Sequence, residues 1–153
     1  MANDIPGIKT PKFTLKGHCC LARLVDIVDC DTLHVVFTFG DIFYKWNVRV
    51  MGVEKNTGID ATEFSFSFFT NQSGLNRKEL KDHLERNQTL VSIKCGEFDK
   101  YGRLLGDIEY GGISLADELL RQKLAYKYLG GTKLPMKDQR FQFVRSISLQ
   151  PWP

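Results

Sequence analysis

Three short segments of this chain carry charged residues of the kinds that bind metal ions and phosphate groups. Segment 28–33 (Val-Asp-Cys-Asp-Thr-Leu) is an acidic turn between apolar runs, segment 48–54 (Val-Arg-Val-Met-Gly-Val-Glu) holds an arginine and a glutamate, and segment 99–103 reads Asp-Lys-Tyr-Gly-Arg. Hard divalent cations prefer carboxylate ligands. Arginine binds phosphate oxygens in pairs and stabilises charge that develops in a transition state. These are the groups that metal-assisted cleavage of a phosphodiester requires.

Five runs rich in β-branched, leucine and aromatic residues predict the strands that position these segments. They occur at 20–28, 31–39, 42–50, 89–97 and 104–110. The acidic turn joins the first two strands as a pair, and segment 99–103 joins the last two as a hairpin. In the third run every even position is apolar, so the alternation places Arg49 on the opposite face from that set.

Helices are predicted in fewer places. Residues 77–86 carry leucines four positions apart, Ser114 and Asp117 form an approximate capping box, and a last helix spans about 137–149. Residues 54–76 are undecided, because their phenylalanines fit a strand period locally although an Asn-Gln-Ser-Gly run breaks any continuous element. Five strands and about three helices in this order predict an α+β, mainly β protein: a five-stranded Greek-key barrel of the oligonucleotide-binding (OB) type.

The length, composition and net charge limit the class of protein. The chain has 153 residues, 42% hydrophobic and 25% charged, which is enough for one globular domain with its own core. Two prolines and two glycines in residues 1–17 predict an irregular arm, followed by a single domain at 18–153. The net charge of +3 permits a nucleic-acid partner but leaves the attraction to a local basic patch. The sequence leaves the oligomeric state open.

Two further absences in the sequence guide the expected location. The amino terminus has no apolar signal-peptide core, and no run approaches eighteen apolar residues, so we expect neither secretion nor a membrane partner. The four cysteines lack C-x-x-C spacing, which favours free thiols in a reducing compartment over a disulfide framework or a zinc site. We therefore expect an intracellular protein.

Taken together, the motifs resemble those of the staphylococcal nuclease (thermonuclease) family. Four segments follow the family's order between about residues 21 and 133: the Asp-x-Asp-Thr turn, the Val-Arg-x-x-Gly strand, the Asp-Lys-Tyr-Gly-Arg turn, and a helix at 114–122 leading into Ala-Tyr-Lys-Tyr at 125–128. The resemblance implies the same barrel fold. It also implies a metal-dependent endonuclease or phosphodiesterase, a hydrolase that uses calcium to cleave DNA or RNA on the 5′-oxygen side of phosphorus.

The resemblance also implies catalytic and metal-binding roles for particular residues. Asp31 matches the family's first metal carboxylate, and Glu54 stands where the family usually has aspartate as the second. Lys55 follows, where a backbone carbonyl is the third protein ligand. Arg49 and Arg103 match the two arginines that clamp the phosphate. The plain alternatives are ordinary turn chemistry for the aspartate and solvated surface positions for the arginines.

Four further residues match nucleotide contacts of the family. Lys100 and Tyr101 stand where the family contacts the nucleotide, and Tyr126 and Tyr128 match its base-flanking tyrosines. Aromatic faces stack on bases, although tyrosines at the ends of strands or helices are often only residues at the edge of a core.

The sequence departs from the family at its chemical centre. Thr57 occupies the position of the glutamate that serves as presumed general base, and threonine cannot accept a proton near neutral pH. Asp60 or Glu63 could replace it from a rearranged loop. The ammonium group of Lys55 is also new, and we expect it to weaken calcium binding. The alternative function is therefore a catalytically degenerate module of the same fold that binds nucleic acid or protein.

Cys30 is a smaller departure, because it stands where the family usually has glycine, between Asp31 and the acidic neighbour Asp29. The resemblance implies that Asp29 acts behind the metal ligands rather than as one of them. A thiol at this position could bind a soft metal, but no histidine lies close to it in the sequence.

Overall fold

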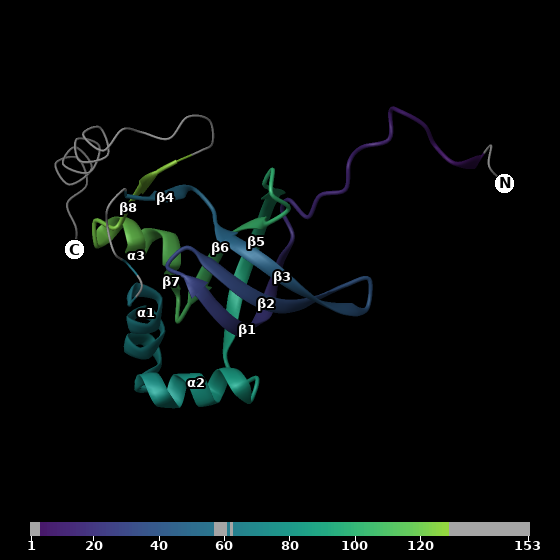
Figure 1. Ribbon diagram of the computed structural model, residues 1–153. Helices are drawn as coiled ribbons and strands as arrows, with labels where there is room; N and C mark the ends of the chain where they lie inside the picture. The colour runs from purple at the N-terminus through teal and green to yellow at the C-terminus, as the bar shows by residue number, and fades with distance from the viewer. Residues whose placement is uncertain (1–3, 57–60, 62, 129–153) are drawn as a thin grey trace.

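The computed structural model describes residues 4–56, 61 and 63–128 (Figure 1). Its strands are β1 (Cys19–Asp29), β2 (Thr32–Phe39), β3 (Ile42–Val50), β4 (Val53–Lys55), β5 (Leu90–Phe98), β6 (Leu104–Tyr110), β7 (Ile113–Ser114) and β8 (Ala125–Lys127). The helices of this part of the chain are α1 (Phe64–Ser73), α2 (Arg77–Glu85) and α3 (Leu115–Arg121). None of them is long and apolar enough to span a membrane.

Five of the strands form a closed barrel. The sheet order is β3-β2-β1-β5-β6-β7, and a parallel pairing of β3 with β6 joins its two sides. The short strands β4 and β8 form a separate antiparallel pair. The prediction of a mainly β protein with a closed five-stranded barrel and three helices is confirmed for the described residues. The strand ends lie within about one residue of the predicted ones, while the helix predicted at 137–149 lies outside these residues.

The barrel interior is filled by branched aliphatic side chains from all five strands. They include Leu24, Leu33, Val35, Val48, Ile93, Leu104 and Ile108, each almost fully buried. Gly106 on β6 lies so deep that a Cβ atom there would come within 3.1 Å of Val48 Cγ1 and Ile93 Cγ1. A side chain at this position would therefore require the Val48 and Ile93 side chains to shift by a few tenths of an ångström.

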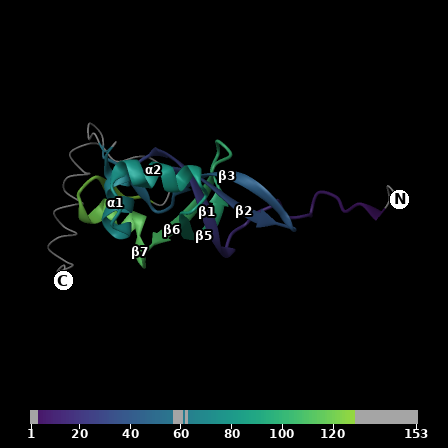
Figure 2. The same ribbon diagram turned by 90° about the horizontal axis from the view of Figure 1, so that it is seen from below.

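The helices cover the sides of the barrel (Figure 2). Helices α1 and α2 lie together beside β1, and α3 packs beside β6 and the β4–β8 pair. Helix α2 begins with a capping box in which Asn76 accepts from the Glu79 N–H at 2.8 Å. The Ser65 hydroxyl donates to the Asp29 carbonyl at 3.1 Å, so α1 is tied directly to the acidic turn.

One prediction about β3 holds only for the half of the strand near the acidic turn. Val48 and Val50 are buried, as their apolar alternation predicts, but Ile42 and Tyr44 are exposed. The reason is geometric, since the β2–β3 hairpin runs past the end of the barrel and projects away from the helices (Figure 1). Its tip at Gly40 and Asp41 has positive φ at both residues, which suits a tight hairpin turn.

Candidate active site

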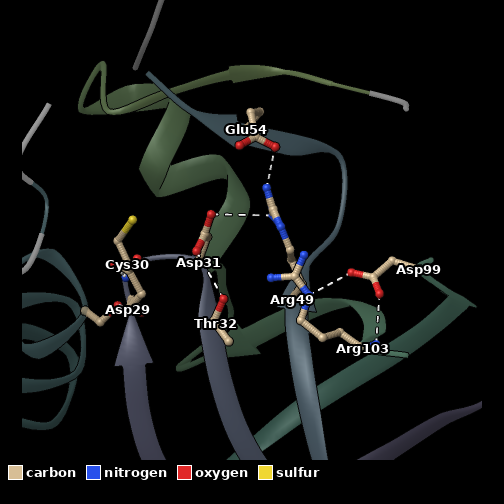
Figure 3. Close-up of polar contacts among 9 residues, drawn as sticks. Asp29, Cys30, Asp31, Thr32, Arg49, Glu54, Asp99 and Arg103 are labelled. Carbon is tan, nitrogen blue, oxygen red and sulfur yellow. Dashed lines mark hydrogen bonds and ion pairs between the residues drawn. The ribbon is translucent and has the colours of Figure 1, made fainter. Parts of the chain in front are cut away.

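An arginine lies between two carboxylates where β2, β3 and β4 meet. The register pairs Thr32 with Arg49, and the Val50 N–H donates to the Asp31 carbonyl at 2.8 Å, so Asp31 is held beside Arg49. Arg49 Nη1 lies 3.5 Å from Asp31 Oδ2, and Arg49 Nη2 lies 2.5 Å from Glu54 Oε2 (Figure 3). Each of the three residues is only 9% exposed. The site is therefore a largely buried charged triad.

A glycine turn brings Glu54 back onto Arg49. Gly52 adopts φ +85°, a conformation that non-glycine residues rarely adopt, and reverses the chain between β3 and β4. The Met51 N–H donates to the Gly106 carbonyl at 2.8 Å, and the Tyr128 N–H donates to the Gly52 carbonyl at 2.9 Å. These bonds fasten the turn to the barrel on one side and to the segment after β8 on the other.

The turn between β5 and β6 is organised by one carboxylate. Asp99 Oδ1 accepts from the backbone N–H groups of Tyr101 and Arg103, both at 2.9 Å, and Oδ2 accepts from Arg103 Nε at 2.7 Å. Gly102 supplies the positive φ that the turn needs. Burial would raise the pKa of Asp99, but these hydrogen bonds and the Arg103 charge outweigh it and lower the pKa.

The two arginines belong to one electrostatic cluster. Burial disfavours the charged form of Arg49, but Asp31 and Glu54 more than offset this and raise its pKa, and Asp99 adds to the effect. Asp99 therefore lies within electrostatic reach of Arg49. Figure 3 shows the side chains of Arg49 and Arg103 between Asp31 on one side and Asp99 on the other. The cluster holds three carboxylates and two guanidiniums.

The donor set fits a hard cation in its chemistry. Asp31 and Glu54 contact the two terminal nitrogens of the same guanidinium from different elements, so both carboxylates lie on one side chain's charged end. Calcium takes six to eight oxygens, including carbonyls and water, at flexible geometry. Within the described residues no group of three or more histidine, cysteine, aspartate or glutamate side chains is placed to hold a metal. Any calcium here therefore depends on two carboxylates supplemented by backbone and water oxygens.

Cys30 packs its thiol into the core beside the acidic turn. Its side chain is fully buried, and burial together with the neighbouring Asp31 and Asp29 carboxylates raises its pKa to about 12. The thiol therefore stays neutral near pH 7. The Cys30 N–H donates to Asp29 Oδ1 at 2.7 Å, so the Asp29 carboxylate caps the backbone of the acidic turn.

The residues that follow Glu54 are anchored to the chain beyond α3. Asn56 donates through Nδ2 to the Lys123 carbonyl at 2.9 Å and through its backbone N–H to the Leu124 carbonyl at 2.9 Å. Lys55 is half-buried and lies within electrostatic reach of Cys30, so its charge acts near the acidic turn. Thr57 itself lies outside the described residues.

Of the two alternative general bases, Glu63 belongs to the described residues and does not join the cluster. Asp60, like Thr57, lies outside the described residues. Glu63 is exposed, and its Oε2 pairs with Arg77 Nη1 at 2.6 Å in a surface groove between α1 and α2. The Glu63 carboxylate is therefore engaged with α2 and not with Asp31 or Arg49.

The predicted nucleotide contacts separate into exposed and buried residues. Lys100 and Tyr101 are exposed at the tip of the β5–β6 turn, where the Tyr101 ring lies 5.1 Å from Lys100 Nζ and 5.5 Å from Arg103 Cζ. Tyr126 pairs directly with Glu54 across the β4–β8 ladder and is 2% exposed. Its ring supports the strand that carries Glu54. Tyr128, half-buried, contacts that ring edge-on at 6.3 Å.

Sequence reasoning missed Asp99 as a residue that positions the site. It was noticed only as part of a motif, although it orients Arg103 and adds to the field at Arg49. The signal was available, because an aspartate four residues before an arginine in a tight turn can cap the backbone and bind the guanidinium at once.

A scan against protein-family models finds no match to the chain, and a search of the curated proteins finds no match either. The class of protein therefore follows from fold and site alone. The described residues define a small OB-like barrel with a largely buried arginine between two carboxylates, where strands β2 and β3 of the barrel meet β4.

Proposed function

We propose that this chain is a nuclease-like protein of the staphylococcal nuclease fold, which hydrolyses phosphodiester bonds of DNA or RNA with calcium. The observation that carries the proposal is the placement of Arg49 between Asp31 and Glu54, with the Asp99–Arg103 pair within electrostatic reach. A phosphodiester cleaver needs hard-cation ligands and phosphate-binding cations in one place, and a surface arginine or an ordinary acidic turn does not require this arrangement.

Arg103 is the residue best prepared to bind the scissile phosphate. Its Nε is bonded to Asp99, which fixes the guanidinium plane, while its terminal amino groups have no hydrogen-bond partner among the described residues. Guanidinium donors in a fixed fork match phosphate oxygens and stabilise the charge that spreads over them in the transition state. Arg49 can serve as the second clamp, in competition with Asp31 and Glu54.

Asp31 and Glu54, with the backbone carbonyl of Lys55, are the residues that would hold calcium. When bound, the ion polarises a phosphate oxygen and neutralises developing charge. We expect weak affinity for two reasons. Arg49 already compensates both carboxylates, and Lys55 adds a second cation near the acidic turn.

No residue is assigned as the general base that would activate the attacking water. Thr57 cannot accept a proton, and Glu63 is paired with Arg77. Absence of a positioned base typically lowers a rate by about 10²–10⁴. We therefore expect slow turnover, because only the bound cation and the arginines would assist the attack of water. If the loss is complete, the same fold and charge cluster describe a module that binds nucleic acid or protein.

Nicking of a supercoiled plasmid tests the proposal. The wild-type protein should nick it slowly in calcium and not in EDTA, and Arg103→Ala should nick it in neither. Arg77→Ala is the matched control, because it removes an exposed arginine far from the cluster and should nick at the wild-type rate. Binding of labelled oligonucleotide without any nicking would replace the enzyme with the binding module.

A further inference from the structure

The projecting end of the β2–β3 hairpin exposes aromatic rings on one face. The register pairs Phe37 with Tyr44 and Phe39 with Ile42, which places these four side chains on the same side of the two strands. Phe37 is buried at the mouth of the barrel, but Phe39 and Tyr44 are each 45% exposed. Nearly half of the surface of each of these two residues therefore remains accessible.

The N-terminal arm extends these rings into a continuous row. The Phe13 ring centroid lies 5.2 Å from that of Phe39 and 6.0 Å from that of Phe98. The Phe98 ring lies 6.4 Å from Trp46, whose ring is 5.9 Å from Tyr44. We call these five residues the aromatic row. Phe98 ends β5, directly before the turn of the candidate site, so the row leads from that site to the hairpin tip.

Lysines border the aromatic row. Lys12 and Lys16 flank Phe13 on the arm, and Lys100 lies in the turn that follows β5; all three are exposed. Over the described part of the chain none of the three forms an ion pair. Acidic side chains on the arm, the hairpin tip and this turn are Asp4, Asp41, Glu97 and Asp99, of which Asp99 pairs with Arg103. The surface thus combines exposed rings with lysines that form no ion pair within the described part of the chain.

We propose that the aromatic row is a stacking platform for single-stranded nucleic acid, which continues the path of the strand away from the candidate site. Every base has a π face, so rings with nearby cations bind single strands without reading their sequence. In a duplex the bases are already stacked on one another. The choice of occupant rests on the proposed function, but the aromatic residues lie outside the candidate site, so the two can be tested apart.

Fluorescence anisotropy tests the inference. The probe is an end-labelled oligothymidylate of about fifteen nucleotides, and EDTA is present to prevent calcium-dependent cleavage. The wild type should bind and lose affinity as salt rises. Tyr44→Ala and Phe39→Ala should each raise Kd about fivefold or more, the lower end of what one stacked base contributes. Phe43→Ala is the matched control: Phe43 is 72% exposed on the same hairpin but pairs with Thr38 on the opposite face. Its Kd should change less than twofold.

Folding is checked separately by thermal melting. Tyr44→Leu keeps apolar bulk without a ring, so it should melt like the wild type yet bind as weakly as Tyr44→Ala. The inference is overturned if Tyr44→Leu binds like the wild type, if Phe43→Ala weakens binding as much as Tyr44→Ala, or if a duplex of the same length binds equally well. A dimer in sedimentation velocity that Tyr44→Leu dissociates would also overturn it, since the row would then be a protein interface.

The failure of this inference and that of the proposed function give different results. Arg103→Ala removes a phosphate-binding residue of the candidate site and should abolish cleavage, whereas Tyr44→Leu leaves the candidate site intact and should weaken binding of the oligothymidylate in EDTA. Binding that depends on Tyr44 in a protein that never cleaves would support the platform and reject the enzyme. Cleavage that depends on Arg103, together with unchanged binding by Tyr44→Leu, would support the enzyme and reject the platform.

Discussion

Replacing Arg49 with methionine should destabilise the protein, because two nearly buried carboxylates lose the cation that both contact. The substitution keeps the apolar stem and removes the guanidinium that lies 3.5 Å from Asp31 and 2.5 Å from Glu54. At an effective dielectric of about 20, each such contact is worth roughly 5 kcal/mol of gross attraction, most of it offset by desolvation. Removing one partner of a buried ionic group typically costs about 3–5 kcal/mol. That is a third or more of the stability of many domains.

Urea denaturation at pH 7 in EDTA measures this loss as a difference in the free energy of unfolding. For a chain of this length the same loss lowers Tm by roughly 6–20 °C. Arg77→Met is the control, because its pair with Glu63 is exposed and should be worth less than about 1 kcal/mol. In the double variant Arg49→Met/Glu54→Gln only the Asp31 carboxylate has lost its contact with Arg49, instead of two carboxylates. The double variant should therefore be more stable than Arg49→Met alone.

Calcium should stabilise Arg49→Met more than it stabilises the wild type, to which it binds weakly. With the guanidinium gone, Asp31 and Glu54 lose the cation that both contact, and a divalent cation can replace the lost charge. The Tm gained on adding calcium should exceed that of the wild type. The reasoning is refuted if Arg49→Met unfolds within about 0.5 kcal/mol of the wild type, or if the double variant is less stable than the single one.

Three further outcomes follow from the site. Because the pKa of Asp99 is lowered in the folded protein, its contribution to stability is complete above the ordinary carboxyl pKa of about 3.9. That contribution is lost as the pH falls through the lower pKa of the folded state. The Tm of Asp99→Asn should therefore fall less steeply than that of the wild type below about pH 4. Thr57→Glu should raise the calcium-dependent cleavage rate tenfold or more, within the roughly 10²–10⁴ range of general bases, and an inert but folded variant would show that more than the base is lost. Iodoacetamide at pH 8 should alkylate exposed Cys19 in the native protein but reach Cys30, whose pKa is about 12, only after denaturation, as peptide mass spectrometry can show.

The strands were predictable because the residues that end them favour tight turns on their own. Gly40 and Asp41 adopt the positive φ angles of a hairpin tip, and Asp99 and Gly102 close the other turn. The helix α1 was not predictable from the same rules. Its alternating phenylalanines suggested a strand, but Phe64 and Phe68, four apart, pack their rings at 6.1 Å against the barrel. Tertiary packing there overrode the local period-two pattern.

The candidate site was predictable as a list of residues but not as a set of contacts. Alternation along β3 assigned a face to Arg49, yet its pairing with both Asp31 and Glu54 depends on closure of the barrel and on the Gly52 turn. Burial of Tyr126 likewise depends on the β4–β8 ladder, whose partners are seventy or more positions apart in the sequence. Local sequence carries no information about contacts of that separation.

The single-turnover cleavage rate of Arg103→Ala, compared with the wild type in calcium, tests the central claim most directly. Arg103 is held by Asp99 at the edge of the cluster, so its loss should leave the fold intact. The rate should drop by about 10³–10⁵, the range for an arginine that stabilises phosphoryl-transfer charge. Wild-type products should carry 3′-phosphate and 5′-hydroxyl ends, as cleavage on the 5′-oxygen side requires. Cleavage by Arg103→Ala at the wild-type rate would contradict the account.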